Sequence, residues 1–173
     1  MRHRIVSSRL LVKAHPVHIY KFIENLENHK TLWPGASNWQ GDKDQARYRW
    51  QLGLGSFNVE TRIVERHPGI RVCEEPVSGA PFPYRRYFKI QPDDQTAILN
   101  ISIEAEMNGL QVALFHLPLK AQLEGILRNI QKTMEKPKPA VAASPMATPA
   151  VATPAPAAAP VPTPSTPPNA ASS

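Results

Sequence analysis

The stretch TAILNISIEAEMNGLQVALFHLPLKAQLEGILRNIQKTM, residues 96–134, decides the fold because a strand pattern runs directly into a helix pattern. In its first part, apolar and polar residues alternate with a period of two, which is typical of a strand with one buried face. The residues expected to point inward are Ala97, Leu99, Ile101, Ile103, Ala105 and Met107. Glu104 and Glu106 then lie on the outer face and form no catalytic carboxylate pair.

After Asn108-Gly109 the sequence predicts a long amphipathic helix, with a kink where Pro118 interrupts it. From residue 119 the apolar residues fall on one helical face, at positions 119, 123, 126, 127, 130 and 134. Such a stripe is stable only against another apolar surface, and the inner face of the sheet is the large one available. We therefore expect the helix to lie across the sheet.

The chain before this stretch predicts a strand, a helix and a series of hairpins. Arg4–Lys13 reads as a first strand, and Pro16 should open a helix that is capped by His15 and ends near Lys30. Turn-forming residues then separate short apolar runs, which indicates a meander of antiparallel strands. The strands expected before residue 96 are Asn38–Gly41, Gln45–Leu52, Phe57–Arg66, Ile70–Pro76 and Tyr84–Gln91.

Composition divides the chain into a folded domain, residues 1–135, and a tail, residues 136–173. From Pro137 onward the tail holds 11 prolines and 12 alanines and no aromatic residue. It has little to bury against the entropy cost of ordering it, so we expect a disordered, extended spacer. A contact between the tail and a protein partner stays open at this point.

Charge and cysteine content exclude several classes of function. The net charge of +6 comes from scattered residues without a long basic run, so we expect no nucleic-acid partner. The single cysteine, Cys73, forms no intrachain disulfide, and the six histidines show no spacing of metal ligands. We expect no metal and no other cofactor. The sequence shows no signal peptide and no membrane span, which indicates a cytoplasmic location.

The order strand, helix, six-strand meander and long helix resembles the START-like helix-grip fold of the SRPBCC superfamily, especially its small bacterial polyketide-cyclase-like and lipid-binding members. Local matches are Ala14-His15-Pro16-Val17, Asn38-Trp39-Gln40, Pro81-Phe82-Pro83 and the closing helix. The resemblance covers residues 1–135. It implies an α+β fold in which a curved antiparallel sheet wraps around a long C-terminal helix, with a short helix between the first two strands. It also implies an apolar ligand in the space between sheet and helix.

Fourteen residues are candidates for contact with such a ligand, because their alternation or their place near the end of the sheet directs them toward this space. They are Tyr48, Trp50, Phe57, Val59, Arg86, Phe88, Leu99, Ile101, Ile103, His116, Leu123, Ile126, Leu127 and Ile130. Each could instead be part of an ordinary core. A buried Arg86 would need a partner, for which a carboxylate of the ligand is one possibility.

Three functions remain open from the sequence. The first is a non-enzymatic carrier of a lipid-like or polycyclic molecule. The second is an enzyme of the polyketide cyclase or dehydratase type, in which His116, Arg86 or Tyr48 would move a proton, and no catalytic residue is fixed. The third is a protein-interaction module, similar to the co-chaperone branch of the SRPBCC superfamily. An inner volume of roughly 300 Å³ or more would favour a ligand, and a filled core would favour protein interaction.

Overall fold

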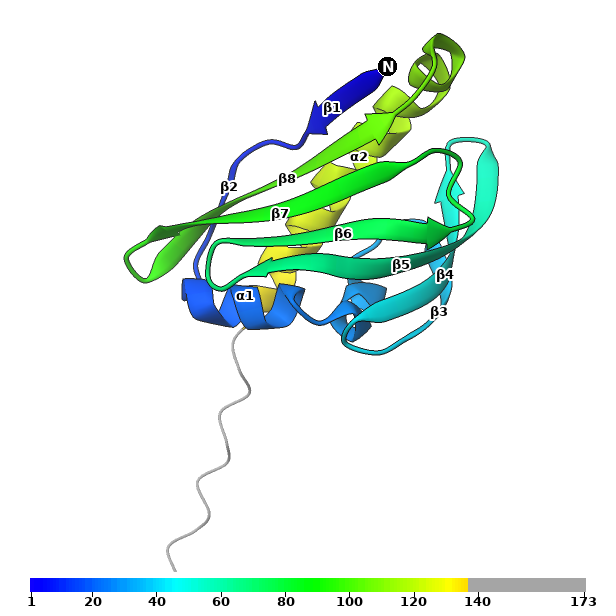
Figure 1. Cartoon of the computed structure of the whole chain (residues 1–173). Coiled ribbons are helices and arrows are strands. Elements are labelled where there is room, and N and C mark those ends of the chain that lie inside the picture. Colours follow the sequence, from blue (N-terminus) through cyan, green and yellow to red (C-terminus); the bar gives the residue numbers. More distant parts are fainter. Residues whose placement is uncertain (137–173) are drawn as a thin grey trace, which may run out of the picture. The chain divides into compact units, whose positions relative to one another are not determined.

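The computed structural model describes residues 1–136, so the Pro/Ala-rich segment beyond them lies outside the described residues. One antiparallel sheet contains all the strands (Figure 1). The strands are β1 (Arg2–Val6), β2 (Leu10–Val12), β3 (Ala36–Gly41), β4 (Gln45–Leu52), β5 (Gly55–His67), β6 (Arg71–Ser78), β7 (Tyr84–Asp93) and β8 (Thr96–Glu106). Their order is β1-β8-β7-β6-β5-β4-β3, and β2 also pairs with β8. The predicted six-strand meander is confirmed as β3 to β8.

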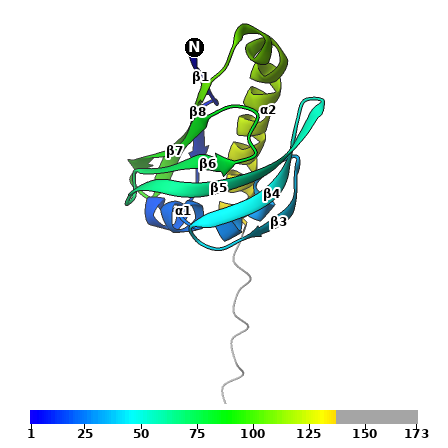
Figure 2. The ribbon, with the colours of Figure 1, turned by 45° about the vertical axis from the view of Figure 1, so that its right-hand side comes forward.

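The helical segments are α1 (Pro16–Ile23), the 3-10 helix η1 (Leu26–Thr31) and α2 (Gly109–Met134). The sheet curves around α2, which crosses its inner face, and α1 lies at the end of the sheet where α2 finishes (Figure 2). The helix α2 continues through Pro118 as one element. None of the helices within residues 1–136 is long and apolar enough to cross a membrane.

The predicted first strand, Arg4–Lys13, is wrong as a single element because the chain leaves the sheet at Ser7 and Ser8. The Ser7 side-chain oxygen accepts a hydrogen bond from the Ile101 N–H at 2.9 Å, where a regular strand would offer a carbonyl. The Ser8 N–H turns away and donates to the Glu124 carboxylate of α2 at 2.6 Å. Serine side chains that compete with backbone groups in this way interrupt regular ladders, so β1 and β2 pair separately with β8.

The predicted helix from Pro16 to Lys30 also divides into two. Its start is confirmed, since the His15 Nδ1 accepts a hydrogen bond from the Val17 N–H at 3.3 Å. It ends early because Asn25 is extended and its side chain accepts from the Glu27 N–H at 3.0 Å, which caps a new 3-10 helix. Asparagine favours caps over helix interiors for this reason.

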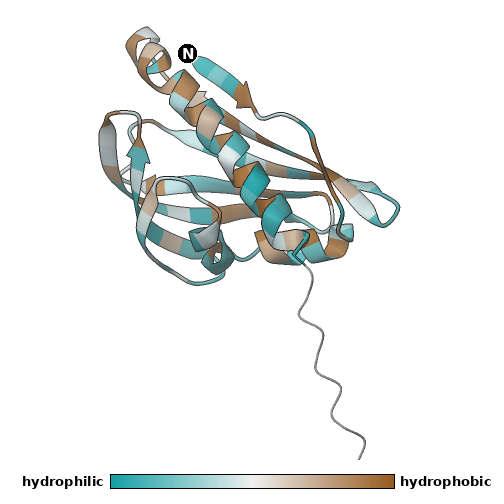
Figure 3. Cartoon of the chain, turned by 180° about the vertical axis from the view of Figure 1, so that it is seen from behind, coloured by the Kyte–Doolittle hydropathy of each residue, from teal (hydrophilic) through white to brown (hydrophobic). Residues whose placement is uncertain are grey.

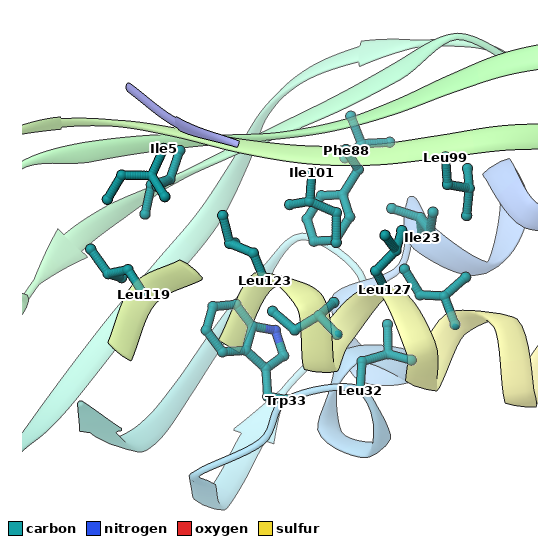
Figure 4. Packing of buried hydrophobic residues seen from close by; sticks show 14 of the residues in the cluster. Ile5, Ile23, Leu32, Trp33, Phe88, Leu99, Ile101, Leu119, Leu123 and Leu127 are labelled. Atoms are coloured by element: carbon teal, nitrogen blue, oxygen red, sulfur yellow. The ribbon is translucent and has the colours of Figure 1, made fainter. Parts of the chain in front are cut away.

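The core lies between the inner face of the sheet and α2, as the periodicities predict. All six inward residues of the last strand pattern are buried, and so are Leu119, Leu123, Ile126, Leu127 and Ile130 of α2. Figure 4 shows Phe88, Leu99 and Ile101 above the row of leucines on α2. Each such side chain contributes about 1.5–3 kcal/mol when it is fully buried. This packing holds α2 across the sheet.

A buried polar cluster in the helix-grip interior

The fourteen predicted site residues do come together, but most of them are packed without free space. Twelve are at most 3% exposed, namely Tyr48, Trp50, Val59, Arg86, Phe88, Leu99, Ile101, Ile103, Leu123, Ile126, Leu127 and Ile130. These twelve side chains are almost inaccessible to solvent, so neighbouring side chains fill the space around them. Phe57 is partly buried against Phe115, and His116 is exposed on α2.

Arg86 finds its partner within the protein rather than in a ligand carboxylate. It lies directly opposite Glu74 in the register of β7 with β6. Both side chains are at most 1% exposed, and the Arg86 Nη1 lies 2.7 Å from the Glu74 Oε1. The Arg86 Nη2 also donates to the Tyr84 hydroxyl at 2.8 Å. The pair therefore carries no net charge into the core, which is the arrangement that a buried charge requires.

The guanidinium of Arg86 also stacks on the indole of Trp33. Its Cζ lies 3.6 Å from the centre of the ring, close enough for a strong cation–π contact. Trp33 follows η1, and in the sequence it stands in the Trp-Pro-Gly stretch that ends the first helical region. The loop after η1 thus covers the ion pair, and Figure 4 shows Trp33 between that loop and α2.

His29 of η1 completes the cluster as an uncharged side chain. Its Nε2 lies 2.8 Å from the Ile23 carbonyl, and because a carbonyl can only accept, this nitrogen carries the proton. Burial lowers the pKa of His29, although the nearby Glu74 carboxylate acts in the opposite direction. The Nδ1 therefore carries only a lone pair, and it lies 3.7 Å from the Glu74 Oε2, too far for a hydrogen bond.

A β-bulge brings a further aromatic residue to the same cluster. The pairing of β3 with β4 slips between Ser37 and Gln40, and Asn38 in the bulge has a positive φ of 56°. Bulges redirect side chains in this way. Here Trp39 stacks on Tyr48 with ring centroids 4.4 Å apart, and Trp33 touches the same tyrosine at 5.6 Å.

Three buried donors in this aromatic cluster have no hydrogen-bond partner among the residues of the described part. They are the Nε1 groups of Trp33 and Trp39 and the hydroxyl of Tyr48. Trp50 shows the ordinary arrangement, since its Nε1 donates to the Gln122 side chain of α2 at 2.7 Å. Burial, with Tyr84 beside it, raises the pKa of Tyr48 well above its usual value, so its hydroxyl keeps its proton and can donate. The aromatic side chains thus offer hydrogen atoms to an acceptor, while His29 Nδ1 and Glu74 Oε1 also accept no hydrogen bond within residues 1–136.

Sequence reasoning missed most of this cluster. It found Tyr48 and Arg86, but not Glu74, His29, Trp33 or Trp39. Strand alternation directs Arg86 inward, which indicates that it needs a partner. The adjacent residues Glu74 and Glu75 give no indication of which one faces inward. Within residues 1–136, no group of three or more His, Cys, Asp or Glu side chains could hold a metal ion.

Comparison with known proteins gives structural matches only. No protein-family model matches the chain, and no curated protein matches it in sequence. A START superfamily protein from Mycobacterium smegmatis superimposes with a TM-score of 0.63 at 16% identity, over 77% of this chain and 97% of that protein. A protein from Thermus thermophilus gives 0.63 at 14% identity, over 76% and 97%. The major latex-like protein 151 of Panax ginseng gives 0.60 at 10% identity, over 78% and 98%. The chain therefore has the START-like helix-grip fold.

Proposed function

We propose that the domain binds an apolar small molecule with a hydrogen-bond acceptor, in the space between the sheet, η1 and α2, and that it does so without catalysis. The observation that carries the proposal is the set of unpartnered donors on Trp33, Trp39 and Tyr48. A buried donor without a partner costs about 1–3 kcal/mol. Groups of such donors are expected where a ligand supplies the acceptor.

The charges around the cluster favour a neutral acceptor over an acid. The guanidinium of Arg86 is already matched by Glu74 at 2.7 Å, so a ligand carboxylate would bring an unmatched charge into the core. A ketone, ester or ether oxygen would accept from the tryptophan and tyrosine donors without this cost. The flat rings of Trp39 and Tyr48 would then contact the apolar part of the ligand.

The end of the sheet near the loop between β6 and β7 supports a route to the interior. The two strands pair only over Arg71–Glu74 and Arg86–Lys89, and the chain between Ser78 and Tyr84 is not paired to either strand. A hollow of about 560 Å³ opens there on the outer face, and Phe82 and Tyr84 are among its lining residues. The interior is filled by side chains, which is the outcome that the sequence analysis associated with protein interaction. Binding of a ligand therefore requires these segments to separate.

The inner titratable groups favour binding over catalysis. Glu74, Arg86 and His29 are directed at one another or at a backbone carbonyl, and Tyr48 holds its proton firmly. His116, the remaining candidate acid or base, is exposed on α2. The cluster is therefore suited to orient a ligand rather than to move its protons.

Titration with Nile red, a neutral apolar dye with a carbonyl group, tests the proposal. We expect a rise in dye fluorescence with wild-type protein and a several-fold weaker affinity for Tyr48→Phe, which removes only the hydroxyl. Tyr20→Phe is the matched control, because Tyr20 lies on α1, outside the polar cluster and the hollow, and it should bind as wild type. Native mass spectrometry of protein purified from cells should also show a bound apolar species. Empty protein that does not bind Nile red would overturn the proposal.

A second function, protein interaction, is favoured by an apolar surface on α2. Leu110, Leu114 and Leu117 are 54–73% exposed and repeat at the spacing of one helical face, opposite the side that packs on the sheet. Figure 3 shows apolar residues at this end of α2. Affinity purification would test it: Leu114→Ser/Leu117→Ser should lose a co-purified protein that Leu11→Ser, with another exposed leucine, retains. Equal recovery with both variants would exclude this surface.

A further inference from the structure

The outer face of the sheet, opposite the face that carries the polar cluster, holds a row of basic side chains. Arg71 of β6 lies directly opposite Lys89 of β7, and Lys89 lies opposite Asn100 of β8. Arg9 continues this row on the other side of β8, since the next residue, Leu10, pairs with Leu99. The strands β6 and β7 and the residue before β2 therefore bring three cations onto one face.

The direct pairing of Arg71 with Lys89 is unfavourable for folding alone, because like charges in opposite positions repel. Arg71 is compensated by Glu65, whose carboxylate lies 2.9 Å from its Nη2. Lys89 and Arg9 form no ion pair with any residue of the described part. Arg9 donates instead to the neutral side chain of Gln91 at 2.6 Å. Two positive charges thus remain without a counter-charge.

These side chains surround a hollow of about 650 Å³, large enough for a small organic molecule. Its lining contains no carboxylate, and it consists of Arg9, His67, Ile70, Arg71, Lys89, Ile90, Gln91, Ile98 and Asn100. Ile70 is 62% exposed at the turn after β5, which gives the hollow an apolar rim beside its cationic floor. The site therefore combines positive charge with apolar surface.

We propose that this hollow is a second binding site, for a small oxyanion that carries an apolar body, such as an alkyl or aryl phosphate. Lys89 and Arg9 bind the oxyanion through charge-assisted hydrogen bonds, and Ile70 and Ile98 contact the apolar part. Asn100 and Gln91 supply further polar contacts on the same face. Charge repulsion between Arg71 and Lys89 falls when the anion binds, so the ligand also stabilises the fold.

Calorimetric titration with hexyl phosphate tests this site. We expect binding that weakens with salt, and about tenfold weaker binding for Lys89→Gln and for Arg9→Gln, because each removes a charged hydrogen bond. Lys120→Gln, an exposed lysine on α2, is the matched control and should bind as wild type. Tyr48→Phe should also bind as wild type, so this result is independent of the function proposed for the interior. Equal affinity of all variants, or no binding of hexyl phosphate, would overturn the site.

Two further probes identify the source of the oxyanion. Inorganic phosphate should bind more weakly than hexyl phosphate, and equal affinity would overturn the role of the isoleucine residues. Vesicles of phosphatidylcholine with phosphatidic acid, compared with phosphatidylcholine alone, distinguish a lipid head group from a soluble compound. Vesicle binding that Lys89→Gln abolishes assigns the site to a membrane lipid. Binding of hexyl phosphate without vesicle binding assigns it to a soluble ligand.

Discussion

Trp39 and Tyr48 stack with their ring planes only 12° apart, although Trp39 lies on the edge strand of the sheet. The stack exists because the bulge at Asn38 adds a residue to β3 and turns the indole toward the interior. Without the bulge, strict alternation from Ala36, which lies opposite Trp50, would place Trp39 on the outer face. One backbone irregularity thus adds the Trp39 indole to the cluster that we propose binds a ligand.

The conformation of Asn38 gives the first prediction. Its φ of 56° is unfavourable for residues with a Cβ, and asparagine tolerates it better than most. Asn38→Ala should therefore lower the free energy of unfolding by about 1 kcal/mol, whereas Asn38→Gly should change it by less than about half as much. Urea denaturation followed by near-UV circular dichroism measures both. A larger loss for glycine than for alanine would contradict the bulge geometry.

The ion pair of Glu74 with Arg86 gives the second prediction, which concerns stability. Glu74→Gln leaves the arginine charge buried without its counter-charge and should lower the free energy of unfolding by about 3–5 kcal/mol. The double variant Glu74→Met/Arg86→Met removes both charges and should recover most of this loss. Glu106→Gln breaks an exposed pair with Arg2 and should cost less than about 1 kcal/mol. Chemical denaturation of wild type and the three variants measures these differences. A double variant as unstable as Glu74→Gln would refute the role of the unmatched arginine charge.

The buried His29 gives the third, a dependence of stability on pH. Its pKa in the folded state lies below the usual value of about 6.5, so the unfolded chain takes up the proton first as the pH falls. The contribution of uncharged His29 to the free energy of unfolding is therefore complete above about pH 6.5. It is lost progressively as the pH falls from there to the lowered pKa of His29 in the folded state. Urea midpoints between about pH 7.5 and 5 should fall for wild type and for the exposed-histidine control His116→Gln. They should fall less steeply for His29→Gln; an unchanged slope would disprove the role of His29.

Two glycines with a positive φ give the fourth prediction. Gly79 and Gly69 have nearly the same φ, +73° and +72°, but different surroundings. A Cβ on Gly79 would lie 1.8 Å from the Asn58 carbonyl oxygen, and one on Gly69 would meet no atom within 4 Å. Gly69→Ala should cost about 1 kcal/mol from the backbone alone. Gly79→Ala should cost about 1–3 kcal/mol more, since the loop between β6 and β7 must shift. Thermal unfolding of both variants measures the difference, and equal losses would contradict it.

Elements with a local periodicity could be predicted from the sequence. The last strand and α2 were found because their apolar residues repeat every two and every three to four residues, and burial follows that repeat. The errors arose where a single side chain replaced a backbone partner. Ser7 divides the first strand by accepting a hydrogen bond from Ile101, and Asn25 ends the first helix by capping the next one.

The polar cluster could be predicted only in part because it depends on pairing between strands. The inward direction of Arg86 follows from alternation within β7, but its contact with Glu74 follows from the register of β6 with β7. A loop joins those strands, and loop length and conformation set the register. Trp39 was missed for a related reason, since a bulge reverses the alternation that sequence analysis relies on.

Pro118 has a dynamic consequence for α2. It has no N–H, so it cannot donate to the carbonyl of Leu114 one turn earlier, and the helix loses one internal bond at its middle. The turns after it are anchored by buried side chains such as Leu123 and Leu127, whereas the turns before it expose Leu114 and Leu117. The first half is held by the partly buried Val112 and Phe115 rather than by a row of fully buried residues. We therefore expect its amide hydrogens to exchange with solvent sooner than those of the second half.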